Sequence, residues 1–276
     1  TTLCVVVALL GLCVGSFLNV VAFRLPKMIE HDFAEACREQ FGVPKDDGSP
    51  RVSLSKPAST CAACNTAIKP WHNLSVIGWL MLRGKCAACS APISVQYPIV
   101  ELLTAVFSVV CVWRFGFSLE LVAALALTWA LIALTVTDLR TMYLPDNITL
   151  PLVWLGLLFS LKGVFAEPAA AIVGAAAGYL ILWSIYWLFK LATGKEGMGY
   201  GDFKLLAALG AWLGWQILPQ IILLSAVVGA AVGVSLMAAR KAEWSSRIPF
   251  GPYLAGAGWI ALIWGEQINR TYLGAF

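Results

Sequence analysis

The chain has 276 residues, of which 60% are hydrophobic and only 12% are charged, and its formal net charge is +4. A soluble domain has about 25% charged residues, so this composition excludes an ordinary water-soluble globular protein. The net charge is modest and no phosphate-binding glycine motif is present, so we expect no nucleic-acid partner.

The apolar residues lie in long uninterrupted blocks, most of them close to the ~20 residues that a helix needs to cross a bilayer. We therefore predict an all-α polytopic membrane protein, embedded in the lipid bilayer by about eight transmembrane helices. Pro219 favours a break between the sixth and seventh helices over one bent helix. The predicted spans are residues 3–22, 97–113, 119–137, 148–164, 169–189, 203–217, 219–239 and 252–268.

The distribution of basic residues predicts the orientation of these spans. In the eight-span topology, every Lys and Arg except Arg114, Lys162 and Arg270 lies on one side of the membrane. The positive-inside rule makes that side cytoplasmic, so both ends of the chain are expected to face outward. Positive charges follow the first span rather than precede it, so we expect a retained helix and not a cleaved signal peptide.

Three segments are predicted along the chain: a first transmembrane helix (residues 1–23), a polar cytoplasmic domain (24–96) and a transmembrane bundle (97–276). Pairs of small residues four positions apart recur in the spans, where they allow two helix backbones to approach closely. The pairs are Gly11/Gly15, Gly174/Gly178, Gly210/Gly214 and Gly229/Gly233.

The polar domain contains the sequence CAAC twice, at Cys61–Cys64 and at Cys86–Cys89. Two C-x2-C knuckles can present four thiolates at the corners of a tetrahedron, which is the geometry that zinc prefers. Disulfides are the alternative, but thiols stay reduced in the cytoplasm. We predict a structural zinc ion, with no open position for a reacting water. The predicted ligands are Cys61, Cys64, Cys86 and Cys89.

Four acids lie in or beside the apolar blocks, where an ionisable group is unfavourable and needs an explanation. Glu101 follows Pro98 near the start of the second span, and Asp146 follows Pro145 at the start of the fourth. Both have a structural interpretation, Glu101 as an acid near a helix N-terminus and Asp146 as an N-cap or loop residue that starts its span. Asp138 ends the third span, where a carboxylate meets the negative end of the helix dipole and caps nothing.

The fourth acid, Asp202, follows the alternating glycines Gly197, Gly199 and Gly201. It is either a plain N-cap of the sixth span or a reactive group that another backbone can approach, because the glycines carry no side chains. The topology places it at the same cytoplasmic border as Asp138. Two close carboxylates share a proton, so that one can activate water while the other donates to a carbonyl oxygen, as in aspartic proteolysis.

Two other classes of protein remain open on the residues alone. An ion-coupled carrier also has acids in its membrane helices, but usually near the midplane rather than at one border. A membrane scaffold could use the zinc knuckles to bind a partner, but it would leave Asp138 and Asp202 unexplained.

Several longer motifs carry a family resemblance, and they span nearly the whole chain. They are GSFLNVVAFRLP at Gly15–Pro26, the cysteine tetrad, YPIVELLTA at Tyr97–Ala105, TDLRTMYLPDNITLPL around Asp138, and GYGD at Gly199–Asp202. The chain resembles the bacterial type IV prepilin leader peptidases, which are intramembrane aspartyl proteases with a Gly-x-Gly-Asp motif. The CAAC knuckles depart from the family pattern, in which a Pro often follows the first Cys.

The resemblance implies that Asp138 and Asp202 are the catalytic pair, that the four cysteines bind zinc, and that residues 97–276 form a transmembrane aspartyl protease bundle. It implies prepilin and pseudopilin membrane substrates with a basic leader, cleaved at the cytoplasmic border of the bacterial inner membrane. It also implies subsequent N-methylation with S-adenosylmethionine. We expect the loop that contains Gly197, Gly199 and Gly201 to pair with the extended substrate segment as an added strand.

Overall fold

The computed structural model describes residues 2–42, 53–56, 58–61, 63–69, 71, 75–239 and 248–273. These residues form helices and connections, with isolated β-bridges but no strand in the part described, which agrees with the predicted all-α class. The elements are α1 (Thr2–Phe41), α2 (Ser75–Met81), α3 (Gln96–Phe115), α4 (Leu119–Thr141), α5 (Asp146–Ser160), α6 (Pro168–Thr193), α7 (Tyr200–Leu213), the 3-10 helix η2 (Trp215–Ile217), α8 (Leu218–Ala238) and α9 (Gly251–Leu273).

Five of the described segments are long and apolar enough to cross a membrane, which makes the chain a multi-pass membrane protein. They are α1, α3, α4, α6 and the segment Trp215–Ala238. α5 is apolar but shorter, so the predicted count of eight spans stays a prediction. The chain divides into two compact units, residues 1–113 and residues 114–276.

In the first unit, α1 packs closely against α3 through two glycines. A Cβ atom added at Gly11 would lie 2.7 Å from Ala105 Cα, and one added at Gly15 would lie 2.7 Å from Glu101 Cα. Only glycine allows the two backbones this close, so the predicted packing role of this pair is confirmed.

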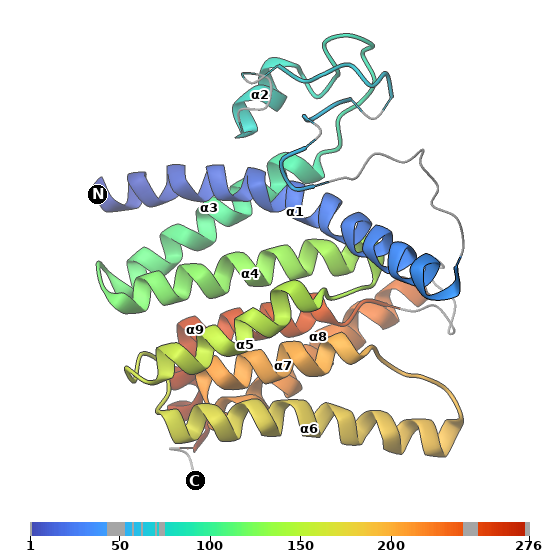
Figure 1. The fold of residues 1–276 in the computed structure, drawn as a ribbon. Helices are drawn as coiled ribbons and strands as arrows, with labels where there is room; N and C mark the ends of the chain where they lie inside the picture. The colour runs from blue at the N-terminus through green and yellow to red at the C-terminus, as the bar shows by residue number, and fades with distance from the viewer. Residues whose placement is uncertain are drawn as a thin grey trace. The chain divides into compact units, whose positions relative to one another are not determined.

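The first helix does not end where the apolar residues end. Figure 1 shows α1 as one helix to Phe41, whereas the predicted first span stops at residue 22, so residues 24–41 of the expected polar domain are helical. Pro26 lies inside α1 and removes one backbone donor without ending the helix. Hydropathy marks where a helix becomes polar, but the helix continues as long as its backbone hydrogen bonds do.

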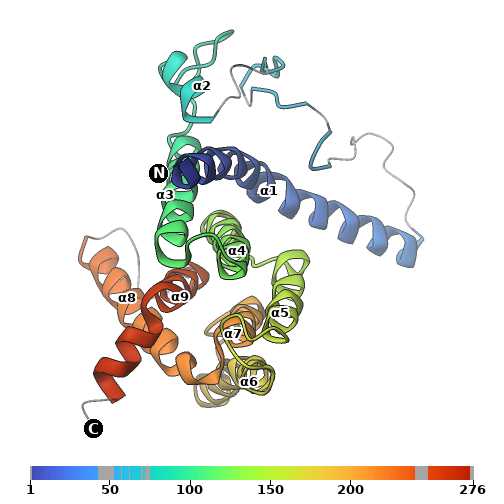
Figure 2. The same ribbon diagram turned by 90° about the vertical axis from the view of Figure 1, so that its left-hand side faces the viewer.

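In the second unit, α7 lies at the centre. The end-on view in Figure 2 shows it beside α5 and α6, and it also packs against α9. Every residue from Asp202 to Leu213 except Lys204 is buried. With 14 residues, α7 is about 21 Å long, shorter than the ~30 Å hydrocarbon core of a bilayer.

Within the predicted span at 203–217, the α-helix ends at Leu213. Gly214, with φ +81°, ends α7, and η2 follows it before Pro219 enters the first turn of α8. This confirms the predicted break. Hydropathy could not distinguish a helix that faces lipid from one enclosed by protein, because both are apolar on all sides.

The close packing of α6 on α7 depends on the second predicted glycine pair. A Cβ atom added at Gly178 would lie 2.5 Å from the Leu206 carbonyl oxygen, and one at Gly174 would overlap the carbonyl group of Gly210. Of the third pair, Gly210 makes the same close contact, with the carbonyl group of Gly174, whereas the other three predicted glycines make no backbone contact of this kind. Gly214 forms the turn after α7, while Gly229 and Gly233 face side chains of Tyr253 and Ile248.

Candidate active site

Asp138 lies in the last turn of α4 and is 4% exposed. Its Oδ2 accepts a hydrogen bond of 3.0 Å from the backbone N–H of Gly251, the first residue of α9. The expectation that Asp138 caps nothing is therefore wrong, because it caps a helix that begins 113 residues later. Its carboxylate faces the positive end of the α9 dipole as well as the negative end of its own helix.

Asp202 lies in the first turn of α7 and is 6% exposed. The N-cap of α7 is Gly199, so the alternative interpretation of Asp202 as a plain N-cap is wrong. The backbone of Gly199 forms a hydrogen bond with the Asp202 carboxylate. The first turn of a helix favours a negative charge at this position.

Leu144, which is 4% exposed, packs against Gly251 beside Asp138 and against Gly201 beside Asp202. A Cβ atom added at Gly251 would lie 2.7 Å from Asp138 Oδ2 and 3.2 Å from Leu144 Cδ1, and one added at Gly201 would lie 2.7 Å from Leu144 Cβ. The two carboxyl groups are close enough for the charge of Asp138 to act on Asp202. The fold thus brings together two acids from different helices in a buried setting.

The loop that contains the glycines ends earlier than the sequence suggested. Tyr200 and Gly201 already belong to α7, and Gly199 is extended, with φ −86° and ψ 154°. Gly197 faces the ring of Phe189, whereas a Cβ atom added at Gly199 would meet nothing closer than 4.0 Å. Of the three glycines, Gly199 has the extended backbone conformation that pairing with an extended peptide needs, whereas Gly201 is helical.

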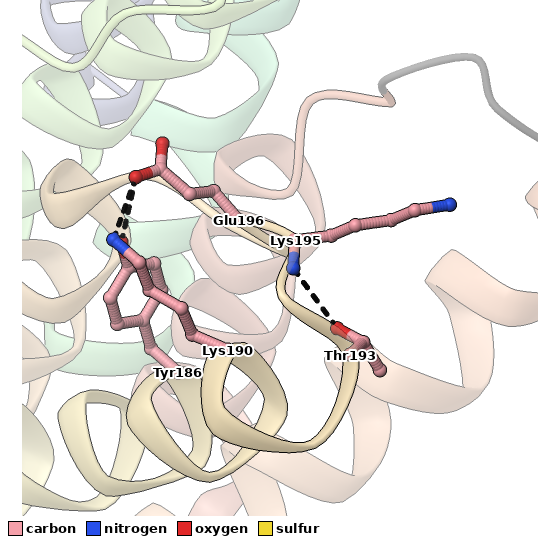
Figure 3. Close-up of polar contacts among 5 residues, drawn as sticks. All are labelled: Tyr186, Lys190, Thr193, Lys195 and Glu196. Carbon is pink, nitrogen blue, oxygen red and sulfur yellow. Dashed lines mark hydrogen bonds and ion pairs between the residues drawn. The ribbon is translucent and has the colours of Figure 1, made fainter.

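A polar anchor precedes this loop, and sequence reasoning missed it. Lys190 Nζ donates to Glu196 Oε1 at 2.9 Å and to the Tyr186 hydroxyl at 3.2 Å, and that hydroxyl donates to Glu196 Oε1 at 3.2 Å (Figure 3). Tyr186 is 2% exposed and lies one helical turn from Lys190 on α6. The i, i+4 spacing of Tyr186 and Lys190 was visible in the sequence, but not their partner.

A second missed contact joins α7 to α5. Lys204 Nζ lies 2.6 Å from Oδ1 and 2.7 Å from Oδ2 of Asp146. Asp146 is the first residue of α5, as expected, but Pro145 is the N-cap and no side chain caps the helix. The acid therefore has an ion-pair partner in place of the expected cap.

The cysteine tetrad lies in the first unit, on two knuckles with matching backbone geometry. Cys61 N–H donates to Thr66 O and Asn65 N–H to Cys61 O, and the second knuckle repeats both bonds between Cys86, Ala91 and Ser90. The residues that follow the knuckles have the left-handed conformation that a tight turn requires, with φ +54° at Asn65 and +59° at Ser90.

The four thiol sulfurs are grouped as a metal site requires. All Sγ atoms lie within 4.8 Å of one another, and those of Cys61 and Cys89 are 3.8 Å apart. Tetrahedral zinc with Zn–S bonds of about 2.3 Å needs sulfurs about 3.8 Å apart. Hydrogen bonds with Thr66 lower the pKa of the Cys64 thiol to about 6, whereas a hydrogen bond with Cys64 raises the pKa of the Cys89 thiol to about 12. The shared protons favour a thiolate at Cys64 before the others.

Comparison with known proteins gives two family matches and many similar sequences. Residues 9–115 match the bacterial Peptidase A24 N-terminal domain, and residues 125–234 match the type IV leader peptidase family. A protein of Aeromonas hydrophila is 55% identical over 98% of this chain and 93% of its own length. Proteins of Stutzerimonas stutzeri and Pseudomonas aeruginosa are each 54% identical over 96% of this chain and 91% of their own length.

All three relatives are named prepilin leader peptidase/N-methyltransferase. No solved structure matches the chain. The peptidase match includes the positions of Asp138 and Asp202, and the N-terminal match includes all four cysteines of the tetrad. The identity and coverage of these relatives show that the chain belongs to the type IV leader peptidase family.

Proposed function

We propose that the chain is a membrane-embedded aspartic peptidase that removes the leader peptide of prepilins and pseudopilins, and that it then N-methylates the new terminus. The observation that carries the proposal is the convergence of two buried carboxylates, Asp138 and Asp202, from helices remote in the sequence. The names of the relatives supply prepilins as the substrate and both activities, whereas pseudopilins follow from the family resemblance alone.

Asp138 and Asp202 act as a general acid–base pair. Because two like charges at one site repel, one carboxyl group keeps a proton while the other is ionised. The ionised group takes a proton from a water molecule as its oxygen attacks the scissile carbonyl carbon. The protonated group donates to the carbonyl oxygen, and the pair then returns a proton to the leaving nitrogen as the C–N bond breaks.

Both acids are oriented by backbone groups at helix N-termini. Gly251 holds Asp138 from the start of α9, and Gly199 holds Asp202 at the start of α7. These contacts leave the second carboxylate oxygens for water and substrate, since an ionised carboxylate has about four acceptor sites. The geometry is consequently set before the substrate binds, which lowers the reorganisation that the reaction needs.

The glycine loop before α7 is proposed to hold the substrate. A helical peptide has its carbonyl groups in hydrogen bonds, so its scissile bond must become extended before cleavage. Gly197 and Gly199 present a backbone without side chains beside Asp202 that can pair with such a segment. Gly201, which lies inside α7, instead allows Leu144 to pack directly against the helix backbone, because a Cβ atom there would lie 2.7 Å from Leu144 Cβ.

The cysteine tetrad is proposed to bind zinc with a structural role. The observed sulfur spacing fits a tetrahedral ion, and a site with four sulfurs leaves no position for a reacting water. Cys61, Cys64, Cys86 and Cys89 would hold the ion and thereby fold the two knuckles together. For the second activity, the proposed donor is S-adenosylmethionine, which supplies a methyl group on a positively charged sulfur.

The proposed location is the bacterial inner membrane, with eight spans and the catalytic pair near the cytoplasmic border. The five long apolar segments support a multi-pass topology, and the distribution of Lys and Arg supports the orientation. α5, α7 and α9 would complete the count as shorter or enclosed helices.

The decisive experiment is incubation of the purified chain with a purified prepilin in detergent, followed by mass spectrometry. We expect loss of the leader without a methyl donor, and a further gain of one methyl group when S-adenosylmethionine is added. The Asp202→Asn variant should cleave nothing detectable. A wild-type protein that leaves the prepilin intact would refute the proposal.

A further inference from the structure

Two motifs that the peptidase chemistry leaves unused meet at a buried polar cluster in the first unit. The motif GSFLNVVAFRLP supplies Ser16 and Asn19 on α1, and YPIVELLTA supplies Glu101 on α3. Asn19 is 3% exposed and Glu101 is 6% exposed. A carboxyl group enclosed by apolar helices indicates a functional site, because a packing contact alone would favour an apolar residue.

The amide of Asn19 is held in one orientation. Its Nδ2 donates to Gly15 O at 3.2 Å and to Tyr97 O at 3.1 Å. Both partners are carbonyl acceptors, so exchanging the amide nitrogen and oxygen would place acceptor against acceptor. Asn19 Oδ1 consequently lacks a hydrogen-bond partner among the described residues, although it is fully buried.

The cluster therefore has more acceptors than donors. The Glu101 carboxyl group has a hydrogen bond with Ser16, but an ionised carboxylate can accept about four. The neighbouring hydroxyls of Thr104 and Ser108 already donate to carbonyl groups of their own helix, at 2.7 and 2.6 Å. The chemical complement of Asn19 Oδ1 and Glu101 is a small cationic group with several N–H donors.

We propose that Asn19 and Glu101 bind the α-amine that leader cleavage releases, and that Glu101 accepts a proton from it before methylation. The proposal rests on the proposed function, which supplies both the amine and the methyl donor. Residues 125–234 match the peptidase family and contain both aspartates, whereas this cluster lies in the separately matched segment 9–115.

The proton must be removed because an ammonium group has no lone pair. An α-amine has a pKa of about 7.7–8.0 and is mostly protonated at neutral pH. The Glu101 carboxylate takes one N–H proton, and the free lone pair of the nitrogen then forms a bond to the methyl carbon. The bond between that carbon and the sulfonium sulfur breaks with its electron pair on sulfur. The products are a methylammonium group, a neutral thioether and a protonated Glu101.

The test compares Glu101→Gln with Thr104→Val, a buried polar residue one turn away that needs no ligand. In Glu101→Gln we expect leader cleavage within about twofold of wild type and methylation reduced at least about 100-fold. The residual methylation should rise about tenfold per pH unit below the amine pKa, because hydroxide then removes the proton. Thr104→Val should retain both activities at all pH values.

Three outcomes would overturn the proposal. They are methylation retained in Glu101→Gln, methylation lost without recovery at higher pH, and loss of both activities while Thr104→Val keeps them. If Glu101→Gln does not fold, wild-type binding decides: mature pilin with a free α-amine should bind at least about tenfold more tightly than α-acetylated pilin. Equal binding would also overturn it. Leader cleavage by the wild type, measured in the same samples, reports separately on the proposed function.

Discussion

One ammonium group, Lys204 Nζ, bridges both carboxylate oxygens of Asp146, at 2.6 and 2.7 Å. The pair joins the fifth residue of α7, two residues after Asp202, to the first residue of α5. It thereby ties the helix that carries one proposed catalytic acid to the segment that follows the other. This contact gives Asp146 a structural role and separates it from Asp138.

Asp146→Asn should retain most of the cleavage activity. The amide oxygen still accepts from Lys204, and the two side chains are 26% and 44% exposed, so the loss of stability should be about 1 kcal/mol or less. The thermal midpoint and the initial rate of leader removal measure both effects. A protein with an unchanged midpoint and no activity would mean that Asp146, and not Asp138, is the reacting acid of this region.

Two substitutions at Asp138 should have different effects on stability and the same effect on cleavage. Asp138→Asn keeps an acceptor for the Gly251 N–H, whereas Asp138→Ala leaves that buried donor unpaired and should destabilise by about 1–3 kcal/mol. Both should reduce cleavage at least about 100-fold, because neither can exchange a proton. Glu120→Gln, in the first turn of the same helix, is the control. Cleavage by Asp138→Asn at the wild-type rate would exclude the proposed pair.

Adding one methyl group at Gly251 should disturb the site directly. A Cβ atom there would lie 2.7 Å from Asp138 Oδ2, so Gly251→Ala must displace the carboxylate or the start of α9. We expect cleavage to fall by about 10- to 100-fold. Gly256→Ala, in the same helix but facing open space, should leave the rate unchanged. Equal rates for the two variants would show that the position of Asp138 against α9 does not matter.

The anchor before the glycine loop should affect catalysis more than stability. Glu196→Gln removes the charge that Lys190 binds at 2.9 Å and loosens the segment that leads to Asp202. We expect kcat to fall about tenfold, because small displacements of a catalytic group are sufficient for this. Lys195→Met is the matched control, since Figure 3 shows its side chain directed away from the anchor. Similar kcat values for both variants would mean that the contacts among Tyr186, Lys190 and Glu196 do not influence catalysis.

Metal analysis of the purified chain should find about one zinc per molecule. Changing Cys61 and Cys64 to Ser together removes half of the ligands, so the metal should be lost. The double change of Cys4 and Cys13 to Ser, which alters two cysteines outside the cluster, should leave the zinc content unchanged. Wild-type protein without zinc, or zinc retained after the first double change, would contradict the assignment.

Features that depend on neighbouring residues could be predicted from the sequence. The apolar blocks indicated most of the helices, because a segment that crosses a bilayer must satisfy its backbone internally and needs about 20 apolar residues. The two CAAC segments indicated the thiol cluster, because each knuckle is a local turn whose geometry repeats at Asn65 and Ser90. The motif around Asp202 directed attention to the acid that the fold buries.

Features that join remote segments were decided by the tertiary structure alone. No local pattern shows that α9 begins against Asp138, that Lys204 reaches Asp146, or that Glu196 turns back onto α6. Hydropathy could not distinguish the enclosed α7 from a lipid-facing span, nor show that α1 continues beyond its apolar part. The local sequence indicates whether a residue requires an apolar, polar or charged environment. The packing of helices determines which remote residues form that environment.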